Sequence, residues 1–501
     1  MKVIFVHLGR EHLGIEYLSA VLKAAGHKTA LAYDPGLFGL EDNVFYIPYL
    51  EKKFNRREDI IRKVEGSGAD IVVFSVYTNT YPWALDIARA VRGRRDIKTV
   101  FGGVHATLVP EKVASEEAVD FVVVGEGEYA LLDLVEAISV SGDTTKIPNL
   151  WYKSNGRPVG NPVRPPINDL DSLPLLDKGL FEKEIDYRHD YMTMASRGCV
   201  FSCTYCCECY YHKLYGKGYF RRRGVASVID ELKVMKERYR FKRVMFFDST
   251  FLVDSKWLKD FLPLYKRDIS VPFRCEGHVK FVDEETIALM KDAGCYGIDF
   301  GVQTFNEDVR KNVLNRHETN REIDKAFSIC DNVNMRYDVD LIFGLPQMKE
   351  EDYLTPIRFM ESHRHLNRLK TYYLSFYPKL PIIEKAREAG MIDSKDIERF
   401  DQGDAGDFFH KDIIRDPLHK RWKGDFEKFY KLYPAIPSPL RRFIVEKRLY
   451  RSFHLIPGFI IVFFQFLIGI TKRDLRFYIY INNYLRQFKE RVIRVFRKHR
   501  Q

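Results

Sequence analysis

The first third of the chain alternates short apolar runs with stretches of helical periodicity. The apolar runs cover residues 3–6, 29–33, 71–76, 99–101 and 121–124. Between the first two runs, apolar residues from Ile15 to Ala25 recur at helical spacing, and Gly26 is placed to end that helix. The alternation predicts an α/β domain with a doubly wound, Rossmann-like parallel sheet, in which ligands bind at the carboxyl ends of the strands.

A second series of strand candidates begins after residue 190. Its members are residues 191–195, 243–248, 272–277, 297–303, 337–343 and 371–377, again with helical patterns between them. Six strand–helix units predict a second α/β domain, with its chemistry at the C-terminal ends of the strands.

Residues 149–190 separate the two series. Proline and turn residues dominate residues 161–166 and 169–174, which makes a packed element improbable there. The chain has 501 residues, too many for one ordinary domain. We therefore predict domains at 1–148 and 191–385, a linker at 149–190, and a mainly helical C-terminal region at 386–501.

The cysteines are unevenly distributed. Five of the eight lie between Cys199 and Cys209, and none follows Cys330. This is not a secreted disulfide framework and favours a cofactor site in a reducing cytoplasm. Cys199, Cys203 and Cys206 form a C-x3-C-x2-C loop directly after the first strand of the second series. Three thiolates at this spacing indicate zinc or an iron–sulfur cluster.

The spacing, the preceding strand and the aromatic Tyr205 before the third cysteine resemble the signature of the radical S-adenosylmethionine (radical SAM) enzymes. The resemblance implies a partial (βα)6 barrel in which the three cysteines hold a [4Fe–4S] cluster and the fourth iron binds SAM. In that family, an electron from the cluster cleaves SAM to a 5′-deoxyadenosyl radical, which takes a hydrogen atom from an unactivated carbon. The alternative is a zinc knuckle with a fourth ligand from Cys207 or Cys209. We interpret Cys207 and Cys209 as inert neighbours of the motif, in preference to hydrogen donors or alternative ligands.

The same resemblance suggests SAM contacts on the strands of the second domain. Alternatively, these residues are ordinary polar strand ends. The expected SAM contacts are Tyr205, Asp248, Ser249, Arg274, Glu276, Gln303 and Gly344.

Glycine-containing turns follow the strands of the first domain, among them Gly-Gly-Val-His at residues 102–105 and Gly-Glu-Gly-Glu at residues 125–128. With these turns the domain resembles the cobalamin-binding domain of B12-dependent radical SAM proteins. The Asp-x-His-x-x-Gly loop that supplies an axial histidine in other cobalamin proteins is absent. We therefore expect no protein histidine on cobalt, and His7, His12 and His105 are interpreted as pocket or surface residues. The expected cobalamin contacts are His7, Leu8, Gly9, Ser75, Tyr77, Thr78, Gly102, Gly103, His105, Gly125, Glu126 and Gly127.

The end of the chain is strongly basic. Residues 441–501 carry 15 Lys or Arg against 3 Asp or Glu, so their net charge of +12 exceeds the +11 of the whole chain. Residues 452–471 carry no charge and have about the length of a membrane span, but basic residues flank both ends. An apolar stripe from Tyr478 to Val495 predicts a basic amphipathic helix. We interpret the region as a membrane attachment; the alternatives are a helical lid and, less favoured, a nucleic-acid contact.

Together these features predict a cobalamin-dependent radical SAM enzyme that methylates an unactivated carbon of a small hydrophobic, lipid-like substrate. One alternative is ring formation or another C–C bond on a lipid or tetrapyrrole. The other is a cofactor-binding sensor without turnover, against which the intact cysteine loop argues. We expect a flavodoxin- or ferredoxin-type electron donor, a cytoplasmic location on the inner face of the membrane, and no nucleic-acid partner.

Overall fold

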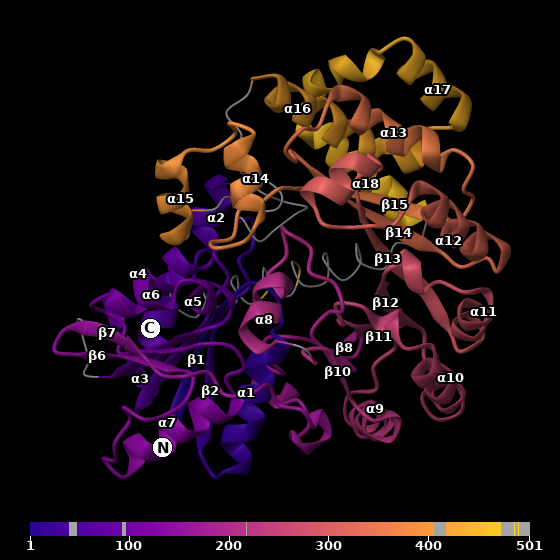
Figure 1. Cartoon of the computed structure of the whole chain (residues 1–501). Helices are drawn as coiled ribbons and strands as arrows, with labels where there is room; N and C mark the ends of the chain where they lie inside the picture. Colours follow the sequence, from indigo (N-terminus) through magenta and orange to yellow (C-terminus); the bar gives the residue numbers. More distant parts are fainter. Residues whose placement is uncertain are drawn as a thin grey trace.

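The computed structural model describes residues 1–39, 48–92, 97–216, 218–404, 417–471, 485 and 489. Two α/β units lie side by side, and helices from the last quarter of the chain lie above them (Figure 1).

The N-terminal sheet has seven strands in the order β2-β1-β3-β4-β5-β6-β7. The first five in sequence run parallel, which confirms the predicted doubly wound sheet. Residues 3–6 of β1 are buried, as expected for a central strand with both faces covered. The strands are β1 (Lys2–Leu8), β2 (Lys28–Asp34), β3 (Ile71–Ser75), β4 (Lys98–Gly102), β5 (Phe121–Val123), β6 (Leu150–Ser154) and β7 (Arg157–Gly160).

Helices cover both faces of this sheet because side chains alternate along each strand. Val3 and Phe5 share one hydrophobic cluster with α1 and α7, whereas Ile4 and Val6 share another with α3 and α4. The helices are α1 (Leu13–Ala24), α2 (Pro48–Phe54), α3 (Arg57–Gly66), α4 (Tyr81–Arg92), α5 (Val104–Leu108), α6 (Pro110–Ser115) and α7 (Glu128–Ser139).

Two strands lie at the start of the segment predicted as a linker. β6 and β7 pair as an antiparallel hairpin and extend the N-terminal sheet at its β5 edge. After Gly160 the chain contains only the short 3₁₀ helices Leu170–Ser172 and Lys178–Leu180 before the second unit. The buried Lys178 anchors this stretch through Glu11 at 2.5 Å and Glu16 at 2.8 Å. We therefore propose that the first domain extends to Gly160.

The second unit is a six-stranded, all-parallel sheet in the order β15-β14-β13-β12-β11-β8, as expected for a partial barrel. Five strands lie where they were predicted, but β15 begins at residue 366 and not at 371. Charged residues of β15 such as Arg368 and Lys370 interrupt its apolar pattern. The start of the strand could therefore not be recognised from hydrophobic periodicity. The strands are β8 (Tyr191–Thr193), β11 (Val244–Phe246), β12 (Phe273–Gly277), β13 (Cys295–Gln303), β14 (Tyr337–Phe343) and β15 (Leu366–Tyr373).

Helices cover the outer face of this sheet. A separate two-stranded ribbon, β9 (Ser196–Arg197) with β10 (Arg221–Arg222), brackets the cysteine loop. The helices are α8 (Glu208–Tyr215), α9 (Val225–Tyr239), α10 (Ser255–Leu264), α11 (Glu284–Asp292), α12 (Asn320–Asn332) and α13 (Glu350–Met360), with π-helices Tyr265–Ile269 and Val309–Val313 and 3₁₀ helices Phe251–Val253 and Val279–Phe281.

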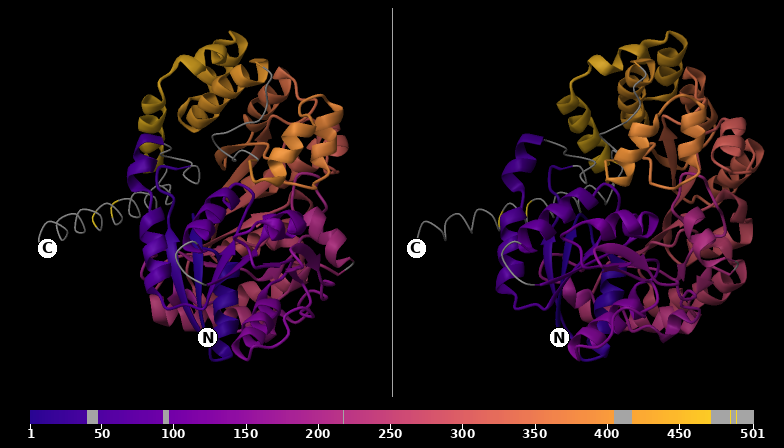
Figure 2. Two further views of the ribbon diagram at one scale, coloured as in Figure 1. Left: turned by 90° about the vertical axis from the view of Figure 1, so that its left-hand side faces the viewer. Right: turned by 60° about the vertical axis from the view of Figure 1, so that its left-hand side comes forward.

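The C-terminal region is helical, as predicted, and its parts lie over both units (Figure 2). After α15 the chain reaches the first domain, where a Cβ on Gly403 would come within 3.0 Å of the Thr78 carbonyl oxygen. α16 packs on the barrel, and the Tyr430 hydroxyl donates to the Tyr353 carbonyl at 2.6 Å. The helices are α14 (Ile382–Glu388), α15 (Ser394–Asp401), α16 (Pro417–Leu432), α17 (Ser438–Glu446) and α18 (Gly458–Thr471), with 3₁₀ helices Tyr433–Ala435 and Leu449–Leu455.

The uncharged segment at residues 452–471 is bent in the structure. Within the described ranges, no single helix has the length and apolar composition of a membrane span, but Leu449–Leu455 and Gly458–Ile468 meet these criteria as a pair with a 109° bend. The predicted amphipathic helix from Tyr478 to Val495 lies outside the described residues, except for Leu485 and Lys489.

Candidate cofactor site

The three motif cysteines lie on the loop between β9 and α8. This loop leaves from the C-terminal end of the first barrel strand, where a barrel carries its chemistry. Gly198 opens the loop with a φ of +83°, and a Cβ there would come within 2.6 Å of the Tyr219 carbonyl oxygen, so a side chain cannot be accommodated. Cys199 and Cys203 are buried and Cys206 is half-buried.

Hydrogen-bond donors surround the sulfur atoms. The backbone N–H of Phe201 donates to Cys199 Sγ at 3.4 Å, and Thr250 Oγ1 lies 3.4 Å from the same sulfur. Arg316 Nη1 donates to Cys203 Sγ at 3.7 Å. Burial raises the pKa of the Cys203 thiol to about 11, and the positive charge of Arg316 opposes this shift. Three sheltered thiols with nearby donors fit an iron–sulfur cluster, whose potential depends on hydrogen bonds to sulfur.

Across the described residues, no group of three or more His, Cys, Asp and Glu side chains is arranged to hold a single metal ion. The three motif thiols are therefore not placed to share one metal ion. A cubane cluster takes one thiolate per iron, so its ligands need not converge in this way.

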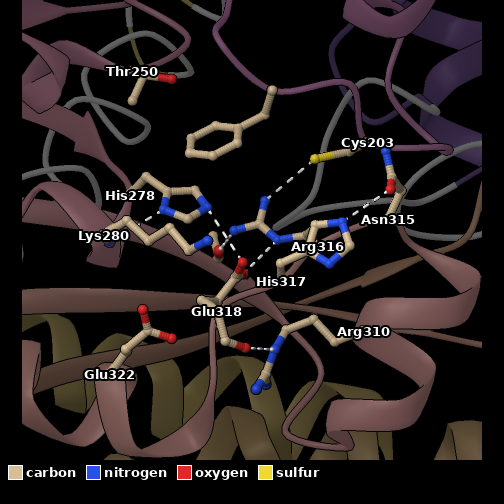
Figure 3. Close-up of polar contacts among 12 residues, drawn as sticks. Cys203, Thr250, His278, Lys280, Arg310, Asn315, Arg316, His317, Glu318 and Glu322 are labelled. Carbon is tan, nitrogen blue, oxygen red and sulfur yellow. Dashed lines mark hydrogen bonds and ion pairs between the residues drawn. The ribbon is translucent and has the colours of Figure 1, made fainter.

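Arg316 is a site residue that the sequence analysis missed (Figure 3). Its guanidinium also donates to Glu318 at 2.7 Å and to the Gly301 carbonyl oxygen at 2.6 Å, which fixes it beside the cluster loop. His278, which lies 3.6 Å from Glu318, stacks on Phe201 of the same loop with 4.1 Å between the rings. The polar run from Asn315 to Glu318, directly after an apolar turn, was the available signal.

Two residues expected to contact SAM have other partners in the structure. The buried Asp248 carboxylate accepts hydrogen bonds from the Ala195 backbone N–H at 3.1 Å and from the Ser196 hydroxyl. Burial raises the pKa of Asp248, and the charge of Arg222 opposes this effect. Ser249 donates to Glu208 at 2.9 Å. Asp248 thus braces the start of the cluster loop through its side chain.

Gln303 keeps features of a ligand contact. It ends β13 with a φ of +68°, which is strained for a residue other than glycine. Its side chain is half-buried. Gly344 directly follows β14 and has a φ of +74°. The hydroxyl of Tyr205 lies 3.5 Å from Arg316. A residue with a strained backbone and a glycine at these strand ends fit a bound polar ligand such as SAM.

Arg274 and Glu276 point into the barrel among other charged side chains. Arg274 forms ion pairs with Asp299 and, at 3.6 Å, with Asp338. Burial raises the pKa of Glu276 to about 8, and the negative charge of Asp299 adds to this shift. This shift favours the protonated form of Glu276, which can donate a hydrogen bond to a ligand.

The expected cobalamin contacts follow the parallel strands β1, β3, β4 and β5, so the fold brings them to one edge of the sheet. Gly103 has a φ of +89°, and a Cβ there would lie 2.7 Å from the Val76 backbone nitrogen. The turns after β3 and β4 therefore pack too closely for a side chain at this position. Such a close, glycine-lined edge fits a large flat ligand.

The histidines at this edge have local partners. His7 Nε2 pairs with the Arg10 carbonyl oxygen at 2.6 Å, His12 Nδ1 accepts from the N–H of Ile15 at 3.2 Å, and His105 Nδ1 lies 3.2 Å from Thr78 Oγ1. Burial lowers the pKa to about 3 for His7 and His105 and to about 4 for His12. These low pKa values favour the neutral form of all three, and His12 Nε2 also lies 3.4 Å from Ser75 Oγ, so both of its ring nitrogens have partners.

Glu126, expected to contact cobalamin, instead pairs with the β9–β10 ribbon. Arg221 holds its carboxylate at 2.8 and 3.0 Å, and Arg197 lies 3.5 Å away. Burial opposes ionisation of Glu126, but the hydrogen bonds and charges of these arginines outweigh it and lower its pKa. The Gly125 turn therefore lies against the segment that carries the cluster loop.

Comparison with known families agrees with this arrangement. Residues 4–135 match the B12 binding domain, and residues 194–360 match the radical SAM superfamily. The chain belongs to the cobalamin-binding radical SAM enzymes. Its cofactors are accordingly a [4Fe–4S] cluster, SAM and cobalamin.

Relatives of this radical SAM enzyme differ in their reactions. An uncharacterized methyltransferase of Pyrococcus horikoshii is 27% identical over 68% of this chain and 74% of its own length. The anaerobic magnesium-protoporphyrin IX monomethyl ester cyclase of Rubrivivax gelatinosus is 26% identical over 69% of this chain and 63% of its own length. The fold resembles that of OxsB, a cobalamin-dependent S-adenosylmethionine radical enzyme solved with aqua-cobalamin and S-adenosylmethionine bound. The two structures superpose with a TM-score of 0.65, and the sequences are 15% identical. The match covers 91% of this chain and 72% of OxsB.

Proposed function

We propose that the enzyme transfers a methyl group to an unactivated carbon of a small hydrophobic, lipid-like substrate. The observation that carries this proposal is that one chain places a three-cysteine loop at a barrel mouth directly beside the glycine-lined edge of a cobalamin-binding domain. Similarity to the Pyrococcus horikoshii methyltransferase supports methyl transfer. Similarity to the Rubrivivax gelatinosus cyclase favours ring formation as a second candidate.

In this proposal, Cys199, Cys203 and Cys206 hold the cluster, and Arg316 donates to the Cys203 sulfur. Gln303, Gly344 and the other predicted strand-end residues bind SAM, with Asp248 acting through the cluster loop that it braces. The turns after β1, β3, β4 and β5 bind cobalamin. When bound, the cluster and SAM supply the radical that removes a hydrogen atom, and cobalamin supplies the methyl group.

We also propose that α17, α18 and the 3₁₀ helix between them dock on an anionic membrane and bring a lipid-phase substrate to the barrel. Phe459 and Phe463 are 75% and 57% exposed on α18, whereas Ile461 between them is buried. Arg442, Lys447 and Arg448 are exposed on the preceding segment. Exposed aromatic side chains beside cationic ones suit the interface of an anionic membrane.

The function is tested with SAM that carries a trideuterated methyl group. The holoenzyme, reduced anaerobically by flavodoxin, is incubated with membrane lipid extract, and products are analysed by mass spectrometry. A lipid that carries the intact label is expected. An unlabelled product that has lost two hydrogens would favour ring formation, and turnover of water-soluble metabolites alone would contradict the lipid-like substrate. The Cys203→Ala protein is the matched control.

Cobalamin is expected to bind without a protein histidine on cobalt, since the Asp-x-His-x-x-Gly loop that would supply one is absent from the sequence. The EPR spectrum of the Co(II) holoenzyme is therefore expected to lack nitrogen hyperfine structure from protein. Hyperfine structure that disappears in the His7→Ala, His12→Ala or His105→Ala protein would contradict this prediction. His363→Ala, a change in the barrel, serves as the control.

A further inference from the structure

The cluster loop and the cobalamin-binding domain are joined by a buried ionic network. Glu126 on the β5–α7 turn contacts Arg221 of β10 and Arg197 of β9, and Arg197 also donates to Glu128 at 2.6 Å. The four side chains are between 5% and 14% exposed. The Ile167 backbone N–H donates to Glu126 at 2.7 Å, so a third segment shares the same carboxylate.

A second connection runs through α8. The helix begins at Glu208, two residues after the last motif cysteine, and His212 on it pairs with the Cys199 carbonyl oxygen at 2.7 Å. At its other end, Tyr215 accepts a hydrogen bond from the Glu126 backbone N–H at 2.6 Å. A Cβ on Gly125 would overlap the Tyr215 hydroxyl, so this contact requires glycine. One short helix therefore links the cluster loop to the cobalamin-side turn.

Such contacts specify position more than they add stability. Burying charges costs desolvation energy that roughly offsets their attraction, whereas removing one partner leaves the others unpaired in a dry site. Arg197 and Arg221 are opposite each other in the β9–β10 ribbon, so a shift of the turn by one residue would unpair both. The geometry thus permits one register between the two units.

We infer that Glu126 is a positioning residue that, through Arg197, Arg221 and Tyr215, sets the distance between the cluster and cobalamin. This role differs from the direct cobalamin contact expected from the sequence. It requires both cofactors but does not depend on the identity of the methyl acceptor, so its test is independent of the proposed substrate.

The test uses the full-length chain carrying the cluster and Co(II) cobalamin. The reduced cluster is expected to enhance the spin relaxation of Co(II), because two paramagnetic centres at a fixed distance interact. Glu126→Gln is expected to retain both cofactors. The relaxation enhancement is expected to be weaker and to vary more from molecule to molecule, because the distance between the two centres is less fixed. Amide hydrogen exchange at residues 123–128 is expected to rise on the order of tenfold, because two arginines lose their partner.

Glu116→Gln is the matched control, since it removes the exposed ion pair to Arg89 in the same domain. Tyr215→Phe removes only the hydroxyl that Glu126 N–H contacts and is expected to give a smaller change in the same direction. It also serves as the deciding variant should Glu126→Gln fail to fold. Unchanged relaxation in a folded Glu126→Gln holoenzyme overturns the inference. So does loss of cobalamin binding without increased exchange, which would restore a direct cobalamin contact.

Discussion

Changing Cys199, Cys203 or Cys206 to Ala is expected to abolish reductive cleavage of SAM. The three thiolates hold three of the four irons of the cluster and leave the fourth iron open for SAM. Loss of any one thiolate therefore leaves a second iron without its protein ligand. The measurement is the formation of 5′-deoxyadenosine after anaerobic reconstitution, with iron and sulfide quantified in parallel. Cys203→Ala is the most informative of the three, because it also removes the sulfur to which Arg316 donates.

Cys207→Ala and Cys209→Ala are the matched controls and are expected to retain SAM cleavage. Cys207 lies next to a motif cysteine, and Cys209 packs in the barrel core, where it is 5% exposed. A small loss of stability from Cys209→Ala is therefore compatible with full cleavage. A Cys203→Ala protein that makes 5′-deoxyadenosine at the parent rate would show that the cluster ligands are assigned wrongly.

Removing residues 441–501 is expected to abolish flotation with anionic liposomes. Basic residues near an anionic surface contribute on the order of 1 kcal/mol each, and burying a Phe side chain contributes about 1.5–3 kcal/mol, so a few of each suffice. High salt is expected to release the intact protein only partly, because it screens the charges and leaves the apolar contacts in place.

The structure offers a less disruptive variant than truncation, which would also remove Tyr450 and Ile444 from the core. Phe459→Asp combined with Phe463→Asp changes only exposed side chains of α18 and is expected to reduce flotation strongly. Val234→Asp, at a 52% exposed position on α9, is the control and should float like the parent. Should the intact protein not float at low salt, α17 and α18 are better interpreted as a lid or an oligomer contact.

Features encoded by nearby residues were predictable from the sequence. The cysteine spacing and Tyr205 lie within one loop, and both parallel sheets follow from apolar runs that must be buried on two faces. The glycine turns after the first-domain strands were likewise predictable, because a positive φ or a close backbone approach restricts the residue locally. The family, its cofactors and the order of its two units follow from these local patterns.

Features that depend on pairing between distant segments were decided by the tertiary structure. Arg316 reaches Cys203 across 113 residues, and Glu126 meets Arg221 across 95, so sequence neighbours carry no sign of either contact. The hydrogen bond from the Ala195 backbone N–H to the Asp248 carboxylate also joins distant segments and was not predicted. The start of β15 was missed for the same reason, because its pairing with β14 fixes it. Local periodicity records which residues must be buried, whereas the partner of a buried charge depends on which strands and loops the fold brings together.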